Sequence, residues 1–335
     1  MQDHSADFTW FVCLEGHRWI ETTAFELGRR ARQPSQPFLS DGLPARALRD
    51  FRSYRPLVDH TGLFRTFAET PPTAEGIQSF ADRFGLLGGD VTERIRLPRQ
   101  RGQKSTSLGL GERSDLWTNA ILEMRRAVEL WWAVHELDTE SLQQWIIWRR
   151  GPDGSGVLYR RPAEPDLEAF AGKALPPSGA KIATQSHDPE VMERFAPGDL
   201  AGPALLHVER VINRHLTNRV QARLQQDPNT ARRYTGFAPD GLIGALWLQL
   251  AHAVEHDKNF RRCAECTNWF EVRPSVGRAD KEFCSNACRT RAYRRRQAEA
   301  LKLHAEGLDV EAIARHVSSD ATTVTGWLRR ARRTP

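Results

Sequence analysis

The sequence predicts an α+β protein that is mainly helical, with a body followed by two small C-terminal modules. Apolar residues recur at helical spacing in long segments, and short runs rich in aromatic and β-branched residues lie between them. Four of the five cysteines fall within residues 263–288. We expect an N-terminal α+β body at 1–161, a Pro- and Gly-rich connection at 162–203, a helical part of the body at 204–257, a four-cysteine module at 258–296 and a three-helix module at 297–335.

Strands are expected near both ends of the N-terminal body. Segments 8–14 and 19–25 are rich in aromatic and β-branched residues, which favour an extended chain. Segments 145–148 and 157–159 have a similar composition, and the turn-like segment 151–156 between them predicts a hairpin.

Helices are expected wherever apolar residues keep a spacing of three or four. Thr73 is the predicted N-cap of one helix, and Gly85 its end. A longer helix is predicted at 115–137, and two more at about 204–226 and 239–256. Eight of the ten tryptophans lie before the cysteine module, where core packing is favoured over stacking on a ligand.

The body carries no recognisable catalytic motif. It has no phosphate-binding glycine loop, no His-Glu-x-x-His segment and no nucleophile elbow. Segment 99–111 is basic and rich in Gly and Ser, which predicts a mobile, solvated loop. We expect a body that senses a signal or oligomerises; an enzyme that processes nucleic acid is the alternative.

Positive charge is concentrated at the C-terminal end. Residues 258–335 hold 17 Lys and Arg against 9 Asp and Glu, whereas the preceding residues hold 31 against 33. A basic block on a near-neutral body indicates a polyanionic partner, with a solvated charged face as the alternative. No secretory signal is visible and the longest apolar run, 241–254, is too short to cross a bilayer, so we expect a cytoplasmic protein without a membrane partner.

The cysteine spacing predicts a structural zinc site. Cys263 and Cys266 are separated by two residues, as in a knuckle at the end of a hairpin. Cys284 and Cys288 are separated by three, which places both sulfurs on one face of a helix. This order predicts a treble-clef-like module. A disulfide pair or free thiols are the alternative. This alternative is less favourable because Cys13 is the single cysteine in the rest of the chain, whereas secreted disulfide proteins have cysteines throughout the fold.

Residues 297–335 predict three short helices. Gly307 is a suitable C-cap, Asp309 a suitable N-cap for the second helix, and Ser319 or Asp320 for the third. Segment 307–330 resembles the helix-turn-helix of resolvase-like and homeodomain-like bacterial DNA-binding proteins. An expected small core follows from the apolar spacing: Ile313, Val317, Val324 and Leu328, with Trp327 as its lid.

The helix-turn-helix resemblance implies that the third helix lies in the major groove of DNA. On this basis Thr322, Thr323, Thr325 and Gly326 are expected to approach base edges. Arg329, Arg330, Arg332 and Arg333 are expected to hold phosphates. The arginines behind the last cysteine are further candidate contacts: Arg289, Arg291, Arg294, Arg295 and Arg296.

The cysteine module resembles the CGNR-type zinc finger of bacterial proteins described as stress-induced transcription regulators. The matching residues are Cys263-x2-Cys266-x2-Trp269-Phe270 and Phe283-Cys284-Ser285-x2-Ala287-Cys288-Arg289-x-Arg291. Where that family has Cys-Gly-Asn-Arg, this chain has Cys288-Arg289-Thr290-Arg291. The resemblance implies four zinc ligands, a mostly helical N-terminal domain and Arg291 as a nucleic-acid contact.

Together these patterns predict a zinc-containing transcription regulator that binds double-stranded DNA. RNA is the alternative ligand, because zinc knuckles and arginine-rich helices serve both. A homodimer is expected, since one terminal helix-turn-helix buries little surface.

Overall fold

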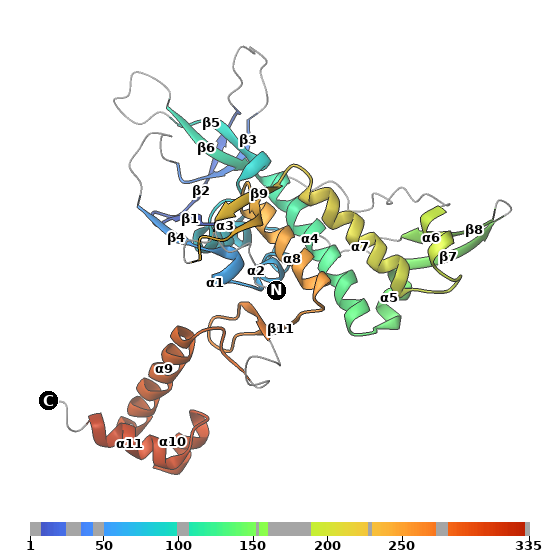
Figure 1. Ribbon diagram of the computed structural model, residues 1–335. Coiled ribbons are helices and arrows are strands. Elements are labelled where there is room, and N and C mark those ends of the chain that lie inside the picture. The colour runs from blue at the N-terminus through green and yellow to red at the C-terminus, as the bar shows by residue number, and fades with distance from the viewer. Residues whose placement is uncertain are drawn as a thin grey trace. The chain divides into compact units, whose positions relative to one another are not determined.

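Figure 1 shows the computed structural model of the chain, which describes residues 8–24, 35–42, 50–98, 107–151, 154–159, 189–226, 230–272 and 281–331. The chain divides into two compact units, Met1–Lys258 and Asn259–Pro335. Both α-helices and β-strands are present, and helices hold more of the described residues than strands do. The mixed α and β character predicted from the sequence is therefore confirmed.

Two antiparallel sheets lie in the N-terminal part of the first unit. One has the order β2-β3-β6-β5, and the other pairs β1 with β4. The two N-terminal segments predicted as strands contribute β1 and β2. The strands are β1 (Trp10–Cys13), β2 (Arg18–Thr22), β3 (Gln36–Ser40), β4 (Phe51–Tyr54), β5 (Thr92–Arg96) and β6 (Leu108–Arg113).

The loop predicted at 99–111 is wrong at its C-terminal end, because residues 108–111 belong to strand β6. Residues 99–106 lie outside the described part. The glycines that suggested a loop have a packing role instead. A Cβ at Gly111 would lie 2.7 Å from Ile95 Cδ1 and 3.3 Å from Phe38 Cβ. Glycine here lets the side chains of neighbouring strands close over the sheet.

The helices of the first unit begin and end close to several predicted positions. Thr73 Oγ1 accepts a hydrogen bond from Gly76 N at 3.2 Å, and Gly85 ends the helix with a φ of +90°. Both predicted end residues are confirmed. The helices are α1 (Pro56–Asp59), α2 (Leu63–Ala68), α3 (Ala74–Phe84), the 3-10 turn η1 (Gly89–Val91), α4 (Ser114–His135), α5 (Thr139–Trp145), α6 (Pro189–Arg194), α7 (Ala201–Leu216) and α8 (Leu242–Glu255).

Helices α2, α4, α7 and α8 pack together and enclose the main core of this unit. Trp117 of α4 and Trp247 of α8 are fully buried, as are Phe64 and Phe67 of α2. Core packing of the body tryptophans is thus confirmed at these positions. No helix in the described ranges combines the length and the hydrophobicity that crossing a membrane requires.

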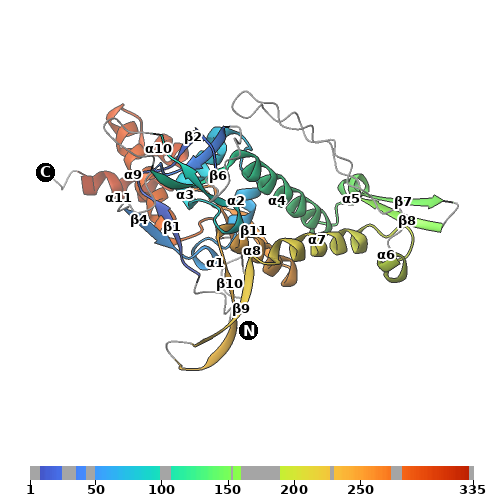
Figure 2. The same cartoon turned by 90° about the horizontal axis from the view of Figure 1, so that it is seen from above.

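The helix predicted at 204–226 is wrong in its second half. Helix α7 ends at Leu216, and Asn218 takes a left-handed φ of +65° that a right-handed helix does not allow. The chain then forms β9 (Val220–Gln226), which pairs antiparallel with β10 (Arg233–Pro239) as a hairpin visible in Figure 2. Leu216, Val220 and Leu224 imitate a helical period only because their spacing is four.

The connection predicted at 162–203 also needs correction where it is described. Helix α6 lies within it and α7 begins at Ala201, while residues 162–188 lie outside the described part. Glu190 of α6 forms ion pairs with Arg194 at 2.8 Å and with Arg210 of α7 at 2.6 Å, and the second pair links α6 to α7. The predicted hairpin is confirmed as β7 (Ile146–Gly151) and β8 (Gly154–Tyr159).

The second unit contains a short hairpin followed by three helices. They are β11 (Asn259–Arg262), β12 (Trp269–Val272), α9 (Asn286–Ala305), α10 (Val310–His316) and α11 (Ala321–Ala331). Asp309 caps α10 and Asp320 caps α11, each accepting a hydrogen bond of 2.7 Å from a backbone N–H group. Gly307 has a φ of +92° behind α9. These sequence-predicted caps are confirmed.

The three helices enclose one small apolar core. It contains the residues predicted from their spacing together with others of α9 and α10: Ala300, Leu303, Ile313, Ala314, Val317, Val324, Trp327 and Leu328. Helix α9 is continuous across the boundary expected between residues 296 and 297, because no Gly or Pro interrupts it from Cys288 to Ala305. The helix of the cysteine module and the first helix of the three-helix core are therefore one element.

Candidate metal centre

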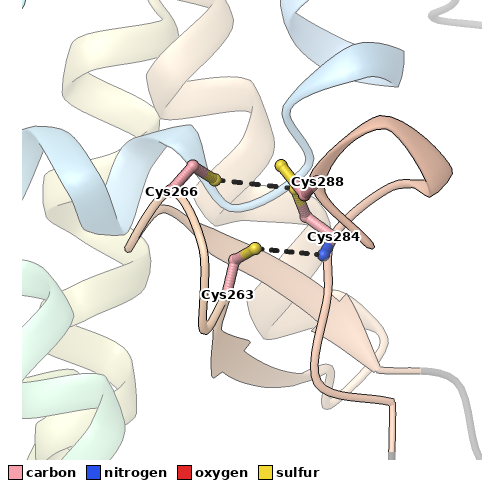
Figure 3. A group of neighbouring side chains, drawn as sticks. All are labelled: Cys263, Cys266, Cys284 and Cys288. Atoms are coloured by element: carbon pink, nitrogen blue, oxygen red, sulfur yellow. Dashed lines mark hydrogen bonds between the residues drawn. The ribbon is translucent and has the colours of Figure 1, made fainter. Parts of the chain in front are cut away.

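Four cysteine sulfurs of the second unit lie within 4.8 Å of one another. Figure 3 shows the four side chains gathered at one place. Cys263 and Cys266 lie in the turn between β11 and β12, Cys284 directly precedes α9, and Cys288 is in its first turn. Cys263 and Cys288 are buried, and the other two sulfurs are partly exposed. The predicted ligand residues are thus brought together and can hold a metal ion.

The turn between β11 and β12 places the sulfurs of Cys263 and Cys266 on the same side. Cys263 N donates to Asn268 O and Thr267 N donates to Cys263 O, each at 2.9 Å. Thr267 takes a left-handed φ of +60°, which reverses the chain within four residues. Thr267 and Asn268 therefore form the turn that precedes β12.

The start of α9 places the sulfurs of Cys284 and Cys288 close together. Ser285 is the N-cap, and its Oγ accepts a hydrogen bond from Cys288 N at 3.2 Å. Cys284 Sγ and Cys288 Sγ lie 3.5 Å apart on the same face of the chain. The two halves meet where Cys284 N donates to Cys263 Sγ at 3.4 Å (Figure 3).

Two of the distances between sulfurs are close to those of a tetrahedral thiolate site. A zinc ion bound to four sulfurs at about 2.3 Å requires sulfur pairs about 3.8 Å apart. Cys266 Sγ lies 3.6 Å from Cys284 Sγ, close to that value, as is the 3.5 Å distance from Cys284 to Cys288. The geometry is compatible with Zn²⁺.

The surroundings of Cys263, Cys266 and Cys284 shift the pKa of each thiol. Burial raises the pKa of the Cys266 and Cys284 thiols, and the neighbouring cysteines raise that of Cys284 further. Burial acts in the same direction on Cys263, but hydrogen bonds from the backbone N–H groups of Cys266, Cys284 and Glu265 lower the pKa of its thiol to about 6. The lowered pKa favours the thiolate of Cys263, and a divalent cation would stabilise the thiolates of Cys266 and Cys284.

Three of the five candidate arginines of α9 make contacts inside the unit. Arg291 donates from Nη2 to Cys288 Sγ at 3.0 Å. Arg295 forms an ion pair with Glu265 at 3.1 Å, and Arg296 donates to Ser318 O at 3.4 Å. Arg289 and Arg294 are exposed and form no ion pair within the described residues.

The candidate contacts on α11 also differ in their surroundings. Thr322 and Arg329 are exposed. The Thr323 hydroxyl donates to Asp320 Oδ2 at 2.7 Å, and the Thr325 hydroxyl donates to Ala321 O at 2.8 Å. Arg330 is exposed, whereas Arg332 and Arg333 lie outside the described residues.

One contact of the site was not predicted from the sequence. Trp327 Nε1 of α11 donates to the Tyr293 hydroxyl of α9 at 2.6 Å, and the two rings meet edge to face at 5.4 Å. Tyr293 lies five residues after Cys288 in the same helix. Its aromatic character amid arginines is the only sequence signal that could have suggested this role.

The fold and the site define a protein of mixed α and β structure with a four-cysteine centre that can hold a metal ion. Comparison with protein-family models, with curated proteins and with solved structures gave no match for this chain.

Proposed function

We propose that this chain is a zinc-containing protein that binds double-stranded DNA through its second unit and regulates transcription. Helix α9 supports this proposal through the contacts that its residues make. This helix supplies Cys288 to the metal centre, holds α11 through Tyr293, and exposes Arg289 and Arg294 to an outside partner. The centre and the three-helix core are thus joined by a single rigid element.

Zinc is the metal that the ligand set favours. Four thiolates are soft ligands, and they leave no open position for a reaction on the metal. The metal would be held by Cys263, Cys266, Cys284 and Cys288 and would join the β11–β12 hairpin to α9 in a treble-clef-like arrangement. The cluster around the sulfurs is otherwise small, with Phe270 as its one other buried apolar residue among those described. A segment of this size gains its stability from the metal.

The α10–α11 pair supports DNA as the partner. The two helices are joined by residues 317–320, a turn of the length found in a helix-turn-helix, whose second helix enters the major groove. On this geometry Thr322 and Thr325 would approach base edges, and Arg329 and Arg330 would bind phosphates. Arg289 and Arg294 would add sequence-independent affinity.

The test is binding of the zinc-loaded full chain to a labelled duplex at increasing salt. Replacing Arg289 and Arg294 by Ala should weaken binding to every duplex about ten-fold and lower the salt slope by about 2, one for each lost phosphate contact. The matched control replaces Arg94 and Arg233, two exposed arginines of the first unit, and should leave both quantities unchanged.

Absence of binding by the wild-type chain would overturn the proposal. Folded RNA as competitor decides between the two nucleic acids. Displacement by duplex DNA at lower concentration than by folded RNA supports the proposal, and the reverse order contradicts it.

A further inference from the structure

Gly326 lies in the interior of α11, where glycine is less favourable than every other residue except proline. A Cβ at this position would meet no atom of the described residues within 4 Å. Nothing in the described part of the chain therefore requires the side chain to be absent.

The other helical glycines of the described residues do have an internal reason. A Cβ would lie 2.3 Å from Pro71 O at Gly76 and 2.7 Å from Arg219 O at Gly244. At Gly202 it would lie 2.3 Å from the ring of Phe195. Each of these glycines lets another part of the chain approach the helix, and Gly326 alone among them faces open space.

The face of α11 around Gly326 is the one turned away from the core. Positions three, four and seven apart share a side of a helix. On the buried side lie Val324, Trp327 and Leu328. On the opposite side lie Thr322, Thr325, Gly326 and Arg329.

The chemistry of this face fits a nucleic acid better than a protein surface. Helix α11 contains no Asp or Glu, and its exposed side offers hydroxyls, methyl groups and guanidinium groups. A protein-binding face of this size would present a large apolar or aromatic anchor, and none is exposed on α11. Base edges and phosphates are recognised by Arg and Thr side chains.

We propose that Gly326 is the point at which the backbone of α11 lies directly against duplex DNA in the major groove. This inference rests on the proposed function and names the position that sets how deeply the helix enters. Any side chain at 326 would hold the helix away from the bases, so the position is kept without one although the helix itself would be more stable with alanine.

The test compares wild type, Gly326→Ala and Gly326→Leu as zinc-loaded full chains. Both substitutions should slow amide hydrogen exchange in α11 about five-fold, because both residues favour the helix over glycine. DNA affinity should fall although the helix becomes more stable. The fall should be about ten-fold with Ala and larger with Leu, because the side chain grows. The affinity is measured for the duplex that the wild type enriches from a random pool, or for the pool itself.

The control is Thr290→Ala on α9, an exposed position that also gains helix propensity. It should leave DNA affinity unchanged, which separates a more stable unit from an obstructed surface. If the wild type binds DNA and Gly326→Leu binds it equally well, this inference is overturned and the proposed function is not. Failure of the wild type to bind any duplex overturns the proposed function together with it.

Discussion

The exposed side chain of Arg291 donates a hydrogen bond to a sulfur of the candidate metal centre, Cys288 Sγ. Four thiolates around one Zn²⁺ leave a net charge of −2, which a nearby cation partly offsets. At 3.0 Å from Cys288 Sγ, Arg291 is placed to do so. We therefore assign it to the stability of the centre, and assign the binding of phosphates to Arg289 and Arg294.

Replacing Arg291 by Ala should weaken zinc binding about ten-fold to a hundred-fold, the range typical of partners that support a metal ligand. Competition with a chromogenic chelator measures the change. Arg289→Ala is the matched control, since Arg289 lies in the same turn and makes no ion pair within the described residues. Equal zinc affinity in the two variants would contradict the assignment.

Helix α9 connects the metal centre to the three-helix core without a break. Its first turn holds Cys288, its middle holds Tyr293 against Trp327, and its last turns supply Ala300 and Leu303 to the core. A truncation after residue 296 would cut this helix, so the contribution of α10 and α11 is better tested by substitution. Displacement of the first turn of α9 would be transmitted to α11, because a helix of 20 residues without Gly or Pro does not bend easily.

Tyr293→Phe should loosen α11 while leaving the ring contact in place. The substitution leaves Trp327 Nε1–H, which belongs to a side chain only 2% exposed, without its acceptor. An unsatisfied buried donor costs about 1–3 kcal/mol. Amide exchange in α11 should accelerate about five-fold or more, whereas Tyr234→Phe in the first unit should not affect it. Unchanged exchange in Tyr293→Phe would show that the hydrogen bond does not hold α11.

Across the whole molecule, the features predicted from the sequence are those set by neighbouring residues. The caps Asp309, Asp320 and Gly307 act within four residues of their own positions, and the spacing of the cysteines is itself local. Helix α3 was predictable for the same reason, since Thr73 and Gly85 determine its ends.

The features that could not be predicted depend on residues far apart in the chain. Gly111 suggests a loop in the sequence, because its role depends on Phe38 and Ile95 of neighbouring strands, which pack against it only in the folded sheet. The left-handed turn at Asn218 separates a helix from a strand whose apolar spacing continues that of the helix. The contact of Tyr293 with Trp327 spans 34 residues and requires the fold of α10 and α11 first.

We propose that the second unit, organised by zinc, reads duplex DNA. Selection from a pool of random duplexes, with the zinc-loaded full chain beside Cys266→Ala, is the measurement that tests this proposal. Loss of one of four ligands should abolish stable zinc binding and with it the placement of α9. We predict that the wild type enriches a defined sequence and that Cys266→Ala enriches none. No enrichment by the wild type would show that the second unit does not read DNA, and equal enrichment by both proteins would show that zinc does not organise it for that role.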